Sequence, residues 1–287
     1  MSAVMAPGEG PLAIIAGGGT LPFAVADAVK ARGRRPVMFA LQGVVDPEKV
    51  KAYPHHWVRY GQTGRLLRLA RAEGCRDAVW IGSMVRPRLS QVRLDLASLL
   101  LLPKLLKAFR GGDDHLLSSL GKIFEDQGFR LLGAHEVAPE ILVPEGVLGR
   151  VQPSERDHAD IARALELLRA IGPFDVGQAA VIAGNHVLAV EGAEGTDNML
   201  AHVAQMRSAG RIPSPAGTGV LVKAPKPKQD RRFDLPTIGP RTIDGIARAG
   251  LAGLAVAAGA TIIAEPEQVI AAADREKLFV IGVRGAG

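Results

Sequence analysis

Cysteine is almost absent from this chain, which carries Cys75 alone among 287 residues. An internal disulfide and a cluster of thiolate metal ligands are therefore excluded, which fits a reducing cytosol. Aromatic residues are also scarce, at 4%, whereas proteins that recognise single-stranded nucleic acid generally stack its bases on aromatic side chains. This scarcity argues against a nucleic-acid partner.

Long hydrophobic runs are missing as well. The longest apolar stretches, Leu94–Phe109 and Leu251–Ala264, are shorter than the roughly 18 uninterrupted residues that a membrane-spanning helix needs. The segment Met1–Gly10 has no charged start followed by an apolar core, so we expect no secretory signal and a cytoplasmic protein. Contact with a membrane surface stays open.

The residues that are present indicate a globular α/β protein. Hydrophobic residues make up 47% of the chain, and 34 glycines accompany them, as is typical of parallel strands and helices joined by tight turns. The length predicts about two domains. The formal net charge of +6 indicates an anionic partner, but charge alone does not choose between phosphates, lipid headgroups and nucleic acid.

Strands and helices alternate in the first half of the chain. The apolar run Leu12–Ala16 meets three glycines and then an Ala- and Val-rich segment ending at Gly33, which predicts a strand, a turn and a helix. Further strands are predicted at Pro36–Leu41, Trp57–Tyr60, Ala78–Ile81 and Arg130–Leu132, and helices at Arg65–Ala72, Arg93–Arg110 and His115–Gln127. This alternation implies a parallel sheet, so we expect an N-terminal Rossmann-like parallel-sheet domain over residues 1–138.

Residues 139–153 are rich in proline and glycine and lack periodicity, so we expect a linker there. A second α/β domain, catalytic in our interpretation, is expected over residues 154–287. It begins with a helix that Ser154 and Asp157 cap, and Gly184 with Asn185 predicts a hairpin turn. Its last elements are predicted as helix, strand, helix and strand at Thr242–Ala258, Thr261–Ala264, Glu267–Ala273 and Leu278–Ile281.

The cluster Gly17, Gly18 and Gly19 is a candidate anion site. A glycine turn at a helix N-terminus leaves backbone N–H groups open to a phosphate or diphosphate. As a dinucleotide motif it is defective, because the third glycine of G-x-G-x-x-G falls on Pro22, and Asp46 is the only acid near the expected position. A turn without a ligand is the structural alternative, and a nicotinamide-dependent oxidoreductase acting on a nucleotide sugar is the alternative function.

The turn from Glu191 to Asp197 follows an apolar strand and opens a helix, which is the usual place for a site in an open α/β sheet. Its carboxylates can hold Mg²⁺, while Thr196 and the helix N-terminus face a phosphate oxygen. The alternative is ordinary helix capping with acids in the first turn.

The loop Lys223–Arg241 is too polar to pack and too rich in proline to form a helix, so it is a surface excursion or a site loop. Lys223, Lys226 and Arg231 can neutralise a diphosphate, and Asp230 can hold a metal ion or a water molecule. We select Asp230 as the metal ligand or water-orienting base.

The leucine-rich stretch Leu94–Phe109 is most simply a core helix, but it has more leucines than one core-facing stripe needs and could line an acyl pocket or rest on a membrane. Asp113 and Asp114 follow it as candidate substrate contacts or as a solvated turn. Ser83 lacks the G-x-S-x-G elbow of serine hydrolases, and the histidines show no zinc-ligand spacing.

Four segments together resemble one known family, the LpxI-type UDP-2,3-diacylglucosamine diphosphatases of lipid A biosynthesis. They are Ile15 to Gly19 with Pro22; Gly112 to Asp114; Ala189 to Asp197; and Lys223 to Asp230 with Asp234 to Pro236, Ile238, Gly239 and Thr242. The match spans nearly the whole chain, and the last two segments are long and specific.

The resemblance implies hydrolysis of UDP-2,3-diacylglucosamine to 2,3-diacylglucosamine 1-phosphate (lipid X) and UMP, dependence on Mg²⁺, and a ligand in the cleft between the two domains. It also implies peripheral contact with the cytoplasmic face of the inner membrane, and leaves homo-oligomerisation open. A non-enzymatic anion- or RNA-binding protein is the alternative outside the enzymes. The expected catalytic residues are Asp230, Lys223 and Lys226, and the expected metal ligands are Asp230, Glu191 and Asp197. The expected substrate contacts are Gly17, Gly18, Gly19, Pro22, Ser83, Asp113, Asp114, Gly195, Thr196, Gln229, Arg231 and Thr237.

Overall fold

The computed structural model describes residues 10–83, 93, 95, 98, 121–226, 230–233 and 235–284. Contacts divide the chain into two units, and the division is not a single cut in the sequence. The first unit comprises residues 1–140 and 230–234, and the second comprises residues 141–229 and 235–287. The short segment 230–234 therefore belongs to the first unit although the residues on either side of it belong to the second.

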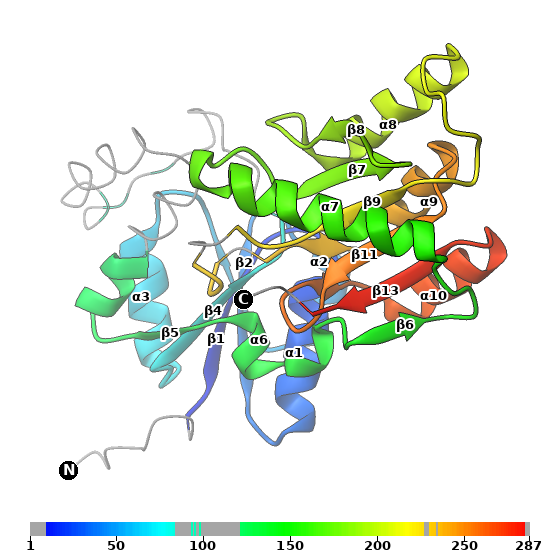
Figure 1. Cartoon of the computed structure of the whole chain (residues 1–287). Helices are drawn as coiled ribbons and strands as arrows, with labels where there is room; N and C mark the ends of the chain where they lie inside the picture. Colours follow the sequence, from blue (N-terminus) through cyan, green and yellow to red (C-terminus); the bar gives the residue numbers. More distant parts are fainter. Residues whose placement is uncertain are drawn as a thin grey trace. The chain divides into compact units, whose positions relative to one another are not determined.

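A five-stranded parallel sheet forms the centre of the first unit (Figure 1), with the strand order β3-β2-β1-β4-β5. Its strands are β1 (Leu12–Ala16), β2 (Pro36–Leu41), β3 (His55–Val58), β4 (Asp77–Ile81) and β5 (Arg130–Leu132). The labelled helices of this part of the chain are α1 (Leu21–Ala31), α2 (Pro47–Val50), α3 (Thr63–Ala72), α6 (Ala134–Val137) and the 3₁₀ helix η2 (Pro139–Ile141). Residues 121–126 are also helical. The expected N-terminal parallel-sheet domain is confirmed.

Burial explains the sequence of these strands. Every residue of β1, β2 and β4 is buried, as is usual for a parallel sheet, and such strands read as nearly continuous apolar runs. The edge strand β3 begins at His55 rather than at the predicted Trp57. Its two histidines are only half-buried, which an edge strand tolerates, and so the apolar pattern did not reveal its start.

The second unit contains a six-stranded mixed sheet with the order β6-β13-β11-β9-β7-β8 and a two-stranded parallel sheet of β10 and β12. The strands are β6 (Gly146–Leu148), β7 (Ala179–Ala183), β8 (His186–Val190), β9 (Val220–Lys223), β10 (Thr237–Ile238), β11 (Gly253–Ala257), β12 (Ile262–Ile263) and β13 (Phe279–Val283). The helices are α7 (Glu155–Ile171), α8 (Gly195–Ser208), α9 (Pro240–Arg248), α10 (Pro266–Arg275) and the 3₁₀ helix η3 (Gly172–Phe174). Strands β9, β11 and β13 are parallel, whereas β6, β7 and β8 pair antiparallel with their neighbours.

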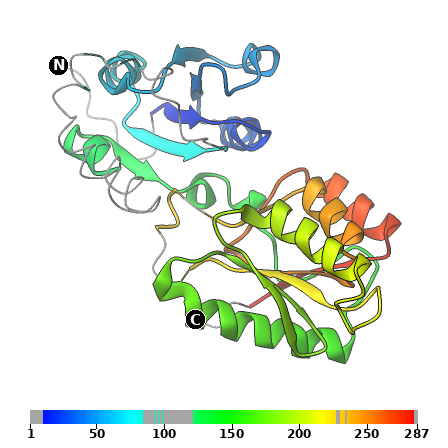
Figure 2. The same cartoon turned by 90° about the horizontal axis from the view of Figure 1, so that it is seen from above.

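Helices cover both faces of the large sheet. Alternate residues of the central strands point to opposite faces, so Leu221 joins a core with α8, α9 and α10, while Val220 and Val222 join a second core with α7. Figure 2 shows α7 on one side of the sheet and the other three helices on the opposite side. The expected second α/β domain is thus present as a sheet between two layers of helices.

Local signals at α7 and at the hairpin are confirmed. The backbone N–H of Asp157 donates to Ser154 Oγ at 3.3 Å, and the N–H of Ser154 donates to Asp157 Oδ2 at 2.8 Å, which is the predicted reciprocal cap. Gly184 and Asn185 form the turn between β7 and β8 with positive φ values of 57° and 69°.

Two segments differ from expectation. Residues 139–153, expected to be a linker, contain β6, which pairs antiparallel with β13 at the sheet edge. The predicted long helix Thr242–Ala258 is wrong: α9 ends at Arg248 and the apolar residues that follow form β11. The reason is that β11 is buried between β9 and β13, so its unbroken apolar run does not alternate and cannot be told from a buried helix by pattern.

None of the helices in the described part of the chain combines the length and the apolar character that membrane crossing requires.

Candidate active site

A buried lysine lies at the carboxyl end of a central strand of the second unit. Lys223, the last residue of β9, is only 8% exposed. Its Nζ donates to Thr196 Oγ1 at 3.0 Å and to the backbone carbonyl of Thr237 at 3.2 Å. Because a buried ammonium group is costly without hydrogen-bond partners, these contacts fix where the charge sits.

Thr196 links this lysine to a carboxylate. Its hydroxyl accepts the hydrogen bond from Lys223 and donates to Glu191 Oε1 at 2.5 Å. The other carboxylate oxygen of Glu191 accepts from the backbone N–H of Gln178 at 3.0 Å. The result is a continuous chain of ammonium, hydroxyl and carboxylate that joins the ends of β8 and β9 to the first turn of α8.

This arrangement suits an anion. Thr196 is the second residue of α8, a helix of 14 residues that starts at Gly195, and the N-terminus of a helix favours negative charge. Gly195 has a φ of 78°, and a Cβ built on it meets nothing within 4 Å, so glycine is required here by backbone conformation rather than by crowding. The sequence prediction brought Lys223, Glu191, Gly195, Thr196 and Thr237 into one site, and the structure places them together.

Two other predicted residues of this unit have protein partners. The ammonium of Lys226 pairs with the carboxylate of Asp175, a residue in the left-handed conformation at the end of η3. Asp197 pairs with the guanidinium of Arg241 on the surface. A phosphate contact of Lys226 or a metal contact of Asp197 therefore requires exchange of an ion pair.

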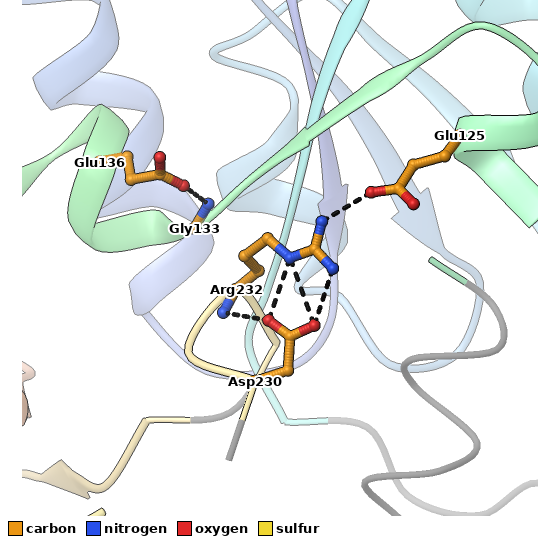
Figure 3. A network of polar contacts seen from close by, with 5 residues as sticks. All are labelled: Glu125, Gly133, Glu136, Asp230 and Arg232. Atoms are coloured by element: carbon orange, nitrogen blue, oxygen red, sulfur yellow. Dashed lines mark hydrogen bonds and ion pairs between the residues drawn. The ribbon is translucent and has the colours of Figure 1, made fainter. Parts of the chain in front are cut away.

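Asp230 is clamped by a neighbouring arginine in the first unit (Figure 3). Arg232 Nη2 donates to Asp230 Oδ2 at 2.8 Å, its Nε lies 3.0 Å from Oδ1 and 3.3 Å from Oδ2, and its backbone N–H donates to Oδ1 at 3.0 Å. Arg232 Nη1 also donates to Glu125 Oε1 at 2.6 Å. The hydrogen bond from Arg232 holds the pKa of Asp230 below its usual value, although burial acts in the opposite direction. Asp230 is consequently an ionised carboxylate at neutral pH. Both of its oxygens accept from Arg232, so a metal ion at Asp230 would also compete with an ion pair.

The glycine turn has a use that differs from the predicted one. The N–H of Gly17 donates to the carbonyl of Ile81 at 2.9 Å, and the N–H of Gly18 donates to the carbonyl of Ser83 at 2.8 Å. Those two amides are therefore hydrogen-bonded to the last residue of β4 and to Ser83 just beyond it, and are not open to an anion. A Cβ on Gly17 would lie 2.6 Å from the Ser83 carbonyl oxygen, so close approach of the two loops accounts for the missing side chain.

Pro22 lies against the same contact, because a Cβ on Gly82 would be 2.9 Å from its Cγ. The loops after β1 and β4 meet where the strand order reverses, which is where open α/β sheets bind their ligands. Gly19 has a φ of 89° and open space around it, so among these glycines it stays the candidate for an anion contact.

The remaining predicted residues divide into two groups. Asp113, Asp114, Gln229 and most of Leu94–Phe109 lie outside the described residues. Arg231 is described and exposed.

The sequence reasoning missed Glu125, Arg232 and Phe233 as neighbours of Asp230. Glu125 is 107 positions from Arg232, and no local pattern connects them.

The described residues do not gather a carboxylate-rich metal centre. Among them, no group of three or more His, Cys, Asp or Glu side chains could hold a metal ion. Glu191 and Asp197 belong to the second unit and Asp230 to the first. The predicted three-ligand set is therefore not assembled within either unit, although Mg²⁺ is often held by only one or two carboxylates together with substrate phosphates.

The fold and these groups define a two-unit α/β protein with a parallel sheet in its first unit and, in its second, a buried cation at a helix N-terminus. Comparison with protein-family models identifies the family. The LpxI N-terminal domain matches residues 11–141 and the LpxI C-terminal domain matches residues 144–281. The chain belongs to the LpxI family, so the resemblance seen in the sequence is confirmed.

A curated relative supports the same assignment. The chain is 46% identical over 272 residues to the UDP-2,3-diacylglucosamine pyrophosphatase LpxI of Caulobacter vibrioides, covering 95% of this chain and 97% of that protein. Among solved structures, glycinamide-RNase-transformylase T from Mycobacterium tuberculosis is 13% identical, with 64% of this chain and 44% of that chain covered and a TM-score of 0.24. A likeness at that level carries no argument.

Proposed function

We propose that this chain hydrolyses the diphosphate of UDP-2,3-diacylglucosamine, giving 2,3-diacylglucosamine 1-phosphate and UMP as a step of lipid A biosynthesis. The observation that carries the proposal is the 46% identity along nearly the full length of a relative named for this substrate. The reaction adds water across one P–O–P bond, so the enzyme is a nucleotide-sugar diphosphatase.

The second unit supplies the phosphate-binding group in this proposal. Lys223 contacts a phosphate oxygen and offsets its charge, while Thr196 and Glu191 hold the ammonium in place. Preorganised charge of this kind stabilises the transition state because it needs no rearrangement when the bond breaks. Gly19, Arg231 and Thr237 are proposed as further substrate contacts.

Asp230 is the proposed catalytic carboxylate. Its ionised side chain can orient the attacking water or bind Mg²⁺ jointly with the diphosphate, and Glu191 and Asp197 are the other proposed metal ligands. Mg²⁺ when bound would neutralise charge on the diphosphate. Since Lys223 and Asp230 belong to different units, the expectation that the substrate binds between the two domains stays a prediction.

The lipid part of the substrate suggests where the enzyme works. Two acyl chains hold the substrate at a membrane, since each buried methylene contributes about 0.8 kcal/mol. We therefore propose a cytoplasmic enzyme that contacts the inner membrane peripherally, with Leu94–Phe109 as the acyl-binding segment.

Release of UMP tests the proposal. Purified protein with UDP-2,3-diacylglucosamine and Mg²⁺ should release UMP, and excess EDTA should stop it until Mg²⁺ is restored. If turnover continues undiminished in EDTA, the metal part of the proposal fails. If no UMP forms under any condition, the assigned reaction fails.

A further inference from the structure

The segment that carries Asp230 packs against the core of the first unit. Residues 230–233 follow β9 and precede β10, which are strands of the second unit, yet they cluster with the first unit. Phe233 is partly buried and packs against the core of the first unit, to which Trp80 and Phe124 belong. A loop that served only to join β9 to β10 would not need to pack an aromatic ring against another core.

The Phe233 ring contacts Trp80 and Gly121, and we call these two residues its seat. Its ring is 5.9 Å from the ring of Trp80 in an edge-to-face arrangement, a geometry that stabilises aromatic pairs. Gly121 also lies against the ring, because an added Cβ there would come within 2.5 Å of Phe233 Cζ. Gly121 starts a described helical stretch, residues 121–126, and glycine weakens a helix relative to alanine by about 1 kcal/mol. Space for the Phe233 ring gives this glycine a structural reason.

The same helix also contacts Arg232, through Glu125. Glu125 lies four residues after Gly121 and therefore on the same helix face, and its Oε1 accepts from Arg232 Nη1 at 2.6 Å. The guanidinium of Arg232 is also 5.6 Å from the centre of the Phe233 ring. Arg232 thus connects Glu125 of the helix to the carboxylate of Asp230 (Figure 3).

We infer that Arg232 and Phe233 are positioning residues, which the helix face of Gly121 and Glu125 holds so that the carboxylate of Asp230 is fixed for the reaction. The inference rests on the proposed function in making Asp230 catalytic. The packing of residues 230–233 against the first unit can be measured without any substrate, so it is tested separately from the reaction.

The variants Gly121→Ala and Phe233→Leu disturb the seat without touching Asp230. We expect each to lower kcat about tenfold or more with KM changed less than about threefold, because small displacements of a catalytic group slow the chemical step strongly. Leucine lacks the Cζ atom that an alanine at 121 would strike, so the double variant should recover part of the activity that Gly121→Ala loses. Such non-additivity is the sign of direct coupling. Arg232→Lys should retain more activity than Arg232→Met.

Phe129→Leu is the matched control. Phe129 belongs to the same core and is 4% exposed, but its ring partner is Phe124 at 6.0 Å rather than Phe233. It should lower the melting temperature at least as much as Phe233→Leu, because Phe129 is the more deeply buried ring, with kcat near wild type. Equal losses of kcat in Phe129→Leu and Phe233→Leu would show general loosening of the core and overturn the inference.

Fluorescence separates the seat from the reaction. In a Trp57→Phe background Trp80 is the remaining tryptophan, and Gly121→Ala should shift its emission and speed amide hydrogen exchange in residues 230–233. If wild-type protein releases no UMP but these shifts occur, the proposed function fails while the seat stands. If Gly121→Ala leaves emission, exchange and kcat unchanged, the seat does not exist and the inference is overturned.

Discussion

The ammonium of Lys223 is held 3.0 Å from the hydroxyl of Thr196, so that a buried charge and a helix N-terminus meet at one point of the second unit. Neither group alone would indicate a site, because buried lysines are rare but can be structural, and most helix N-termini bind nothing. Together with the carboxylate of Glu191 they form a preorganised group that suits a phosphate oxygen.

Lys223→Met should lower kcat/KM about 100-fold, since it removes a preorganised positive charge from the proposed phosphate site. Methionine has a similar volume, but the Thr237 carbonyl and the Thr196 hydroxyl lose their donor, so the melting temperature should fall modestly while kcat/KM falls far more. Steady-state kinetics and calorimetry measure the two effects. Lys49→Met, at an exposed position of α2, is the control for loss of one positive charge. Retention of more than about a third of the wild-type kcat/KM would remove Lys223 from the site.

Asp230→Ala should abolish turnover without unfolding the protein. The side chain is only part-buried, whereas a ligand for metal or water is lost outright. UMP release should therefore be lost while the melting temperature stays close to that of the wild type. A variant that keeps more than a tenth of the wild-type rate, a loss of under about 1.4 kcal/mol in the barrier, would exclude Asp230 from the catalytic set.

Acid should weaken the first unit through Asp77. This residue at the start of β4 is 3% exposed and accepts from Arg34 at 2.6 Å and Arg130 at 2.8 Å. Burial would raise the pKa of Asp77, but the hydrogen bonds from Arg130 and Arg34 outweigh it, so the pKa is lowered. A lowered pKa stabilises the fold above the unfolded value of about 3.9, and this stability is lost as the pH falls through the folded pKa.

Asp77→Asn should therefore reduce the free energy of unfolding by about 2 kcal/mol at pH 7 and flatten its fall below about pH 4. Urea titrations across pH 2.5 to 7 measure both. Glu48→Gln, which breaks the exposed pair with Lys51, should change stability by less than about 0.5 kcal/mol. An unchanged acid slope in Asp77→Asn would contradict the assignment.

Asp160→Ala should destabilise the second unit without affecting catalysis directly. Asp160, on α7, is 2% exposed and accepts from the backbone N–H groups of Gly184 at 2.9 Å and Asn185 at 2.7 Å. Removing the carboxylate leaves two donors of the hairpin turn without this partner, a cost of about 2 kcal/mol. The urea midpoint should fall, and Asp160→Asn should recover part of the loss. Glu166→Ala, exposed on the same helix, should leave the midpoint nearly unchanged.

The sequence by itself determined the features whose cause is local. The cap of α7 by Ser154 and Asp157 and the turn at Asn185 depend on a few neighbouring residues, so their patterns predicted them correctly. The strand β1 was predicted to the residue because an apolar run that ends in glycines has few alternatives. Family membership could also be inferred from the sequence, because the motifs that carry the resemblance are long enough to be recognised in a single chain.

Tertiary structure decided everything that depends on distant partners. The same kind of apolar run became a strand in β11, because β9 and β13 provide hydrogen bonds on both sides of it. The amides of Gly17 and Gly18 were expected to face an anion, but they donate to the carbonyls of Ile81, at the end of β4, and Ser83. Glu125 reaches Arg232 across 107 positions. Sequence patterns show which groups are able to form a contact. Which partner each group contacts depends on the residues that the folded chain brings next to it.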